Sequence, residues 1–157
     1  MVIAPGQSII HCIRDRGAYE PVTEPQEMPL SYYLAKTVPL AFDEAVSRVT
    51  AALKKEGFGI LTDIDVQATL KTKLGVDIPK YRILGACNPG FAHQALQLEN
   101  KLGVLLPCNV IVREERPGQT EVAAIDPVSS MERTGNPKLA AVADEVRVRL
   151  QRAVDSL

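Results

Sequence analysis

Hydrophobic residues recur along this chain with two different periods, and these periods predict its secondary structure. Spacings of three and four residues between apolar side chains indicate amphipathic helices, whereas short runs rich in β-branched and aromatic residues indicate strands. The helical period is clearest at 42–56, where charged residues occupy the opposite side, and again from Pro137 to about Val154. Two long amphipathic helices are therefore predicted at these places.

Shorter segments between the long helices carry the signals of strands and of two short helices. The strands are predicted at 31–38, 58–64, 81–87, 102–112 and 120–125, and the short helices at 66–74 and 89–98. Asp65 and Asn88 immediately precede the two short helices, where a side-chain oxygen can accept hydrogen bonds from the first helical amides. Gly75 ends the first of them, and Pro89 fills the opening position of the second, which needs no amide hydrogen.

The order of these elements predicts the fold class. The later strands follow one another through connections too short for regular helical crossovers, which favours antiparallel pairing. We predict an α+β fold, with a twisted, mainly antiparallel sheet and the two long helices packed on one face. The predicted order is β-α-β-β-β-β-α with short helical inserts.

The chain divides into two regions. Residues 1–30 contain several prolines with acidic residues between them, so they are predicted to form an N-terminal extension, with one short apolar piece at 8–13 as a further strand. Residues 31–157 have the length and periodicity of a single α+β domain.

Charge and composition limit the functional classes. The 18 basic and 19 acidic residues give a formal net charge of −1 without long runs of either sign, so binding to nucleic acid or to an anionic membrane surface is not expected. The N-terminus lacks a basic leader, and no later segment approaches the roughly 20 apolar residues of a membrane span. A cytoplasmic location is therefore expected.

The three cysteines are the main candidates for chemistry. Their odd number and a reducing compartment favour free thiols, and Cys87 and Cys108 lie in strongly apolar surroundings. Cys108 fits a buried packing residue, although Pro107 beside it indicates a strand edge or a bulge that could expose the thiol. Cys87 stands at a strand end before a helix N-terminus, where the helix dipole can lower the pKa of a thiol. Packing and chemical roles both stay open.

Other side chains could complete a site. His93 lies off the apolar stripe of its helix, and with Cys87 and Cys108 it would provide ligands for zinc or a redox metal, although their spacing matches no recognised metal motif. Asp63 and Asp65 lie two residues apart at a strand end and could bind a ligand or act as acid and base. Capping of the following helix explains Asp65 equally well.

Several of these segments, in this order, form a recognisable set: 56–66, 81–89, Ala92-His93 and 105–110. Together they closely resemble the prokaryotic family known as domain of unknown function 302, over about residues 32–127. The resemblance implies a small α+β domain similar in fold to the TATA-binding-protein-like group and commonly seen as a symmetric dimer. It implies no established activity, and a similar fold does not transfer DNA binding.

Two functional hypotheses follow. The first is a cytoplasmic homodimer that binds a small ligand or a protein, with a site near Cys87, Asn88, His93, Cys108 and Asn109. The second is a thiol-based redox or metal-dependent enzyme, with Cys87 as the reactive thiolate, His93 as its proton partner or a ligand, and Cys108 as a resolving thiol or second ligand. Both place the two thiols close together on one apolar face of the sheet. The cofactor, substrate and physiological partner are not predicted.

Overall fold

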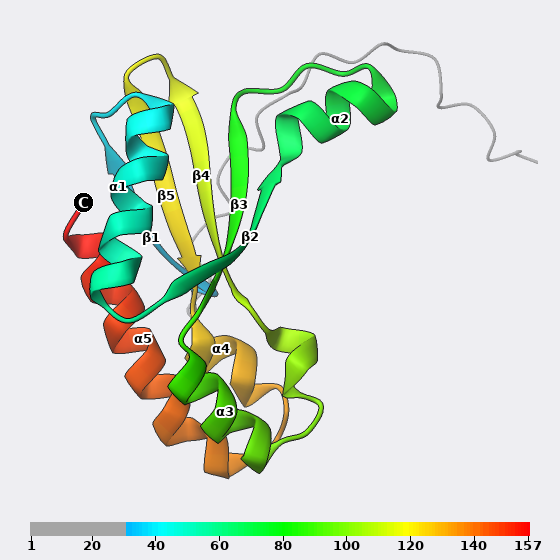
Figure 1. The fold of residues 1–157 in the computed structure, drawn as a ribbon, viewed down its shortest axis with the longest axis vertical. Helices are drawn as coiled ribbons and strands as arrows, with labels where there is room; N and C mark the ends of the chain where they lie inside the picture. The colour runs from blue at the N-terminus through cyan, green and yellow to red at the C-terminus, as the bar shows by residue number, and fades with distance from the viewer. Residues whose placement is uncertain (1–30) are drawn as a thin grey trace, which may run out of the picture.

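A five-stranded antiparallel sheet organises residues 31–157, the part of the chain that the computed structural model describes (Figure 1). The strands lie in the order β1-β5-β4-β3-β2, and every neighbouring pair is antiparallel. Their bounds are β1 Tyr33–Val38, β2 Gly59–Asp65, β3 Tyr81–Cys87, β4 Cys108–Arg116 and β5 Gln119–Ile125. The predicted extension, with its apolar piece at 8–13, lies outside the described residues.

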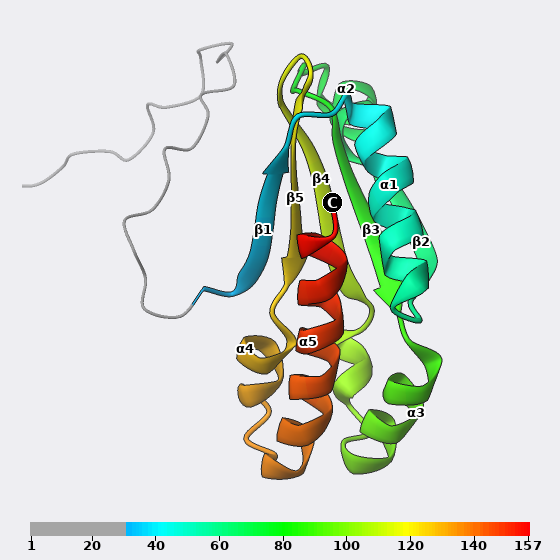
Figure 2. The same cartoon turned by 90° about the vertical axis from the view of Figure 1, so that its left-hand side faces the viewer.

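The two long helices cover one face of this sheet, as predicted. Figure 2 shows α1 and α5 side by side along that face. The helices are α1 Phe42–Lys55, α2 Val66–Leu74, α3 Pro89–Leu98, α4 Pro127–Glu132 and α5 Ala140–Asp155, with 3-10 turns η1 Leu102–Leu105 and η2 Pro137–Leu139. The predicted α+β class is confirmed. Within the described residues, no helix combines the length and apolar composition needed to cross a membrane.

The hydrophobic core lies between the sheet and these two helices. On the sheet side, Val110 and Val112 of the central strand β4 are fully buried. On the helix side, Val49 and Leu53 of α1 and Leu150 of α5 are equally inaccessible. Each such side chain contributes about 1.5–3 kcal/mol on burial, so this layer supplies most of the stabilisation of the domain.

Capping residues determine where the two short helices begin and end, at the positions predicted from the sequence. The Asp65 carboxylate accepts a hydrogen bond of 2.8 Å from the Ala68 amide at the start of α2, and Gly75 ends that helix in the left-handed conformation at φ 70°. The Asn88 side chain accepts a hydrogen bond of 3.3 Å from the Phe91 amide at the start of α3. The helices predicted at 66–74 and 89–98 are both confirmed.

The predicted strand at 102–112 is wrong in its first half. Residues 102–105 form the 3-10 turn η1, and β4 starts only at Cys108 and continues to Arg116. Leu102 is buried, so its apolar character reflects packing of the turn rather than a strand. Pro107 does not lie at a sheet edge. It comes immediately before β4, the central strand, so its missing amide hydrogen removes no hydrogen bond between strands.

The short helix α4 was not predicted from the sequence. Its N-cap is Asp126, whose carboxylate accepts a hydrogen bond of 2.9 Å from the Val128 amide, and its first residue is Pro127. This is the same cap-and-proline signal that correctly predicted α3. The Asp126 carboxylate is buried and also pairs with Arg147 of α5 at 3.0 Å, which ties α4 to the long helix.

Candidate functional site

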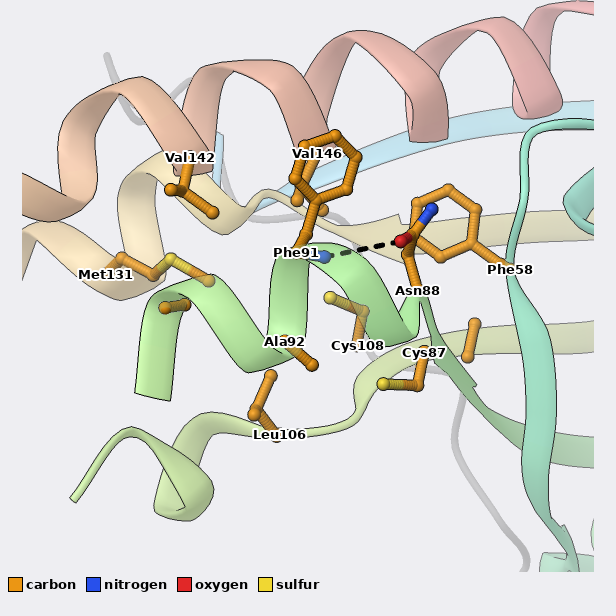
Figure 3. A pocket seen from close by; sticks show the side chains of 12 residues that line it. Phe58, Cys87, Asn88, Phe91, Ala92, Leu106, Cys108, Met131, Val142 and Val146 are labelled. Atoms are coloured by element: carbon orange, nitrogen blue, oxygen red, sulfur yellow. Dashed lines mark hydrogen bonds between the residues drawn. The ribbon is translucent and has the colours of Figure 1, made fainter. Parts of the chain in front are cut away.

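A small cavity lies where β3 passes into α3, beneath the N-terminal half of α5 (Figure 3). Its volume is about 20 Å³, enough for one water-sized occupant. Most of its wall is aliphatic or aromatic, and the polar or sulfur-bearing contributions are few. The residues that line it are Phe58, Ala86, Cys87, Asn88, Phe91, Ala92, Ala95, Leu106, Cys108, Met131, Val142 and Val146.

The segments that carry the family resemblance meet at this cavity. Phe58 comes from the turn between α1 and β2, Asn88 from the end of β3, and Leu106 from the segment before β4. Gly57 has φ +86° and ends α1, and a Cβ atom built there would lie 2.9 Å from the Asn88 side-chain nitrogen. The Asn88 side chain thus caps α3 and packs closely against the α1–β2 turn, which gives it a structural role.

The two thiols reach the cavity from different sides of the sheet. Cys108 pairs with Ala86 across β3 and β4, so Cys87 belongs by alternation to the opposite face. The expectation that both thiols share one face of the sheet is therefore wrong. Both still line the cavity, because Cys87 is the last residue of β3 and Cys108 the first of β4, as Figure 3 shows.

The surroundings of the thiols oppose ionisation. Burial raises the pKa of Cys108 to about 11, and the neighbouring Cys87 adds to this increase. Burial also raises the pKa of Cys87, opposite to the lowering expected from the N-terminus of α3. Both side chains are therefore protonated at neutral pH, and neither has the thiolate character of an activated nucleophile.

The other predicted site residues lie elsewhere. His93 is exposed on α3 and does not line the cavity. Asn109 is exposed opposite Gly85, on the face of the sheet away from α1 and α5. The carboxylates of Asp63 and Asp65 lie 2.8 and 3.9 Å from the guanidinium of Arg82.

Of the predicted candidates, the structure brings together Cys87, Asn88 and Cys108 only. Across residues 31–157, no group of three or more histidine, cysteine, aspartate or glutamate side chains is arranged to hold a metal ion. Phe58 and Phe91, which form the aromatic walls, and Met131 from α4 were not predicted as site residues. Phe58 and Phe91 lay within recognised segments, whereas Met131 belongs to the helix that was missed.

A second surface is more extensive than the cavity. On the sheet face that no described helix covers, one row of apolar residues crosses all five strands. Each member pairs directly with the next across a neighbouring strand. Ala123 is buried, Ile83 and Ile111 are half-buried, and Ile64 is 46% exposed. We call this set the apolar row, and it consists of Ala35, Ala123, Ile111, Ile83 and Ile64.

Polar residues flank the apolar row. On one side, Arg113 of β4 pairs with Glu121 of β5 at 2.9 Å. On the other side lie Asn109, Tyr33 and Thr62, all exposed. The apolar centre and polar border resemble the anatomy of a protein interface. The sequence did contain a sign of this surface, because β2, β3 and β4 each carry an isoleucine that faces away from the core. The pattern within one strand does not show which residues of the other strands lie beside it.

Comparison with known proteins places the chain in a family without an assigned activity. It is similar to a crystal structure of an uncharacterized conserved DUF302 protein from Bacillus stearothermophilus, with 29% sequence identity and a TM-score of 0.75. The similarity covers 80% of this chain and 98% of that one. Among curated proteins, none matches the chain. The sequence model of the family described as domain of unknown function DUF302 matches residues 34–157, and the chain belongs to this family.

Proposed function

We propose that this domain is a homodimeric protein-interaction module whose working surface is the uncovered face of the sheet. The observation that carries the proposal is the apolar row, which crosses all five strands and has no described helix above it. Uncovered apolar patches with polar borders are typical of surfaces that bind another protein. The free thiols of Cys87 and Cys108 suit a cytoplasmic setting for this module.

A second copy of the chain fits this surface well. The row is apolar from one edge strand to the other, so it can face an identical row across a twofold axis without placing like charges at its centre. At its border, Arg113 pairs with both Glu121 and Glu115, at 2.9 and 3.5 Å, so the charges there are partly compensated within one chain. With a formal net charge of −1, two copies repel one another only weakly, and the near balance of charge supports a protein rather than a nucleic-acid partner.

The cavity supports a ligand-binding role less well. Sites for small molecules usually occupy roughly 300–1,000 Å³, whereas this cavity measures about 20 Å³. Asn88, its main polar residue, already accepts a hydrogen bond from the Phe91 amide. The mainly apolar wall therefore fits a packing site at the junction of β3, α3 and α5.

The thiol-based alternative also has weaker support. Burial raises the pKa of both thiols, and His93 does not line the cavity that they share. An enzyme that used Cys87 as its nucleophile would require a depressed pKa or an adjacent base. Rapid alkylation of Cys87 at neutral pH, in a Cys12→Ser background and abolished by Cys87→Ser, would favour the enzyme over the interaction module.

The proposal is tested by placing a charge in the apolar row. Ile111→Lys introduces a cation at the centre of the row, and Ile64→Lys does so at the better-exposed edge of the sheet. Val148→Lys is the matched control, because Val148 is 52% exposed on α5, on the helical side of the sheet. Light scattering after gel filtration measures the mass of each, and circular dichroism verifies its fold.

We expect the wild-type protein and Val148→Lys to have twice the 17.1 kDa mass of the chain. Both isoleucine variants should have the mass of a single chain, because burying an unpaired ammonium group at an interface costs several kcal/mol. A wild-type protein that is monomeric, or a folded Ile64→Lys variant that dimerises like the control, would contradict the proposal.

A further inference from the structure

We propose that the segment 61–76, which we call the β2–α2 arm, docks on the second copy and completes the dimer interface. This inference rests on the proposed homodimer and adds a second contact surface to it. The arm contains the outer part of β2, the helix α2 and the first residues after that helix. Figure 1 shows α2 beyond the β2–β3 side of the sheet, away from α1 and α5.

The helix of the arm contacts β3, and Gln67 donates a hydrogen bond to the Ile78 carbonyl, but the helix packs only lightly on the described chain. None of its nine residues is buried, in contrast to α1 and α5, which bury five and six residues respectively. Isolated helices shorter than about 12–15 residues are only marginally stable in water. The caps at Asp65 and Gly75 define where α2 begins and ends, but they supply only about 1 kcal/mol each. A further surface to pack against would stabilise it.

The apolar side chains of the arm are unusually accessible. Leu61 and Leu74 are 66% and 69% exposed, and Ile64 and Val76 are also exposed. These four account for almost half of the nine large hydrophobic residues that are exposed in the described chain, within only 16 positions. Such a concentration marks an interaction surface, because single exposed hydrophobic residues are normally scattered.

Leu61 lies at a β-bulge in the edge strand β2. The pairing of β2 with β3 shifts between Ile60 and Thr62, so that Leu61 is the extra residue of a β-bulge. Bulges at sheet edges commonly change the direction of a side chain and interrupt pairing with a further strand. Leu61 is therefore available for a side-chain contact, whereas strand addition along this edge is disfavoured.

The size of the sheet face explains why the arm is needed. Five strands spaced about 4.8 Å apart, with three rows of side chains about 6.7 Å apart, cover roughly 500 Å². A stable interface usually buries about 800 Å² on each partner. Ile64 belongs to both the apolar row and the arm, so the arm continues the proposed interface beyond the sheet edge and supplies the missing area.

The test changes the arm without touching the centre of the sheet. Leu61→Lys and Leu74→Lys are made singly and together, with Val148→Lys as the matched control for an exposed apolar residue outside the interface. Lysine is compatible with an edge strand and, at the end of α2, with the helix dipole. Sedimentation velocity over a dilution series measures the dimer dissociation constant of each full-length variant.

We expect the double variant to raise the dissociation constant about tenfold or more, and the control to leave it unchanged. Amide hydrogen exchange should show protection of α2 in the wild-type dimer that disappears on dilution to monomer. An unchanged dissociation constant together with dilution-independent exchange in α2 would overturn the inference while leaving the sheet-face dimer intact. A wild-type chain that never dimerises would instead refute the proposed function itself.

Discussion

Cys108 shows how burial decides the chemistry of a reactive side chain. It is the first residue of the central strand, its side chain faces the core, and it lies close enough to Cys87 for that thiol to add to the increase in the pKa of Cys108. A thiol that stays protonated is a poor nucleophile and a small hydrophobic packing group. Cys108, which attracts attention in the sequence, therefore serves the core.

The raised pKa of Cys108 predicts a specific pH dependence of stability. Its pKa rises from 9.0 to about 11 on folding, so in this range the unfolded chain loses a proton that the folded protein retains. The contribution to the free energy of unfolding is complete below pH 9 and decreases on the order of 2 kcal/mol as the pH rises to about 11. Chemical denaturation at one protein concentration measures this decrease.

Other groups also titrate above pH 9, and a Cys108→Ala variant separates them. The stability of this variant should fall less steeply than that of the wild type between pH 9 and 11. Parallel curves for the two proteins would show that the thiol is not buried as described.

At the scale of elements, Gly85 sets how closely three strands approach. It lies on β3 opposite Thr62 of β2 and Asn109 of β4. A Cβ atom at this position would overlap the Thr62 hydroxyl and lie 2.7 Å from Cγ of Pro107, closer than real Cβ contacts. The side chains of Thr62 and Pro107 thus fill the space that the glycine leaves.

Gly85→Ala should therefore destabilise the protein by about 1–3 kcal/mol, the usual cost of overpacking. Gly103→Ala is the control, because a Cβ atom there would have no neighbour within 4 Å. Thermal unfolding of both variants at equal concentration measures the difference. Equal midpoints for the two variants would contradict the close approach at Gly85.

The elements that the sequence predicts correctly are those with local signals. Caps such as Asp65 and Asn88 act within three residues, so they fix α2 and α3 without knowledge of the rest of the chain. Strand register depends instead on a partner distant in sequence. The pairing of Cys108 with Ala86 could not be read from either segment alone, and for this reason the two thiols were assigned to one face of the sheet.

The domain as a whole has two layers, a sheet and the helices that cover one of its faces, and the described helices leave the other face uncovered. The helices α1 and α5 cover one face of the sheet (Figure 2). The apolar row lies on the face that no described helix covers. An amphipathic sheet needs only one apolar face to fold, so the second apolar face points to association. The dimer and the relation to the TATA-binding-protein-like group, which the family resemblance implies, stay predictions.

The apolar row on the uncovered face becomes visible only in the fold, and it could not be predicted from the sequence. Ile64, Ile83 and Ile111 are separated by 19 and 28 positions and become neighbours only through the strand order β4-β3-β2. The candidate site was predictable in part, since Cys87, Asn88 and Cys108 do meet at one cavity. What the sequence could not provide was the size of that cavity.

Sedimentation equilibrium of the wild-type protein over a wide range of concentrations determines whether two copies associate, as proposed for the uncovered sheet face. We expect a mass of twice 17.1 kDa at high concentration, which falls towards the mass of one chain on dilution. A mass of 17.1 kDa at every concentration would contradict the proposed association.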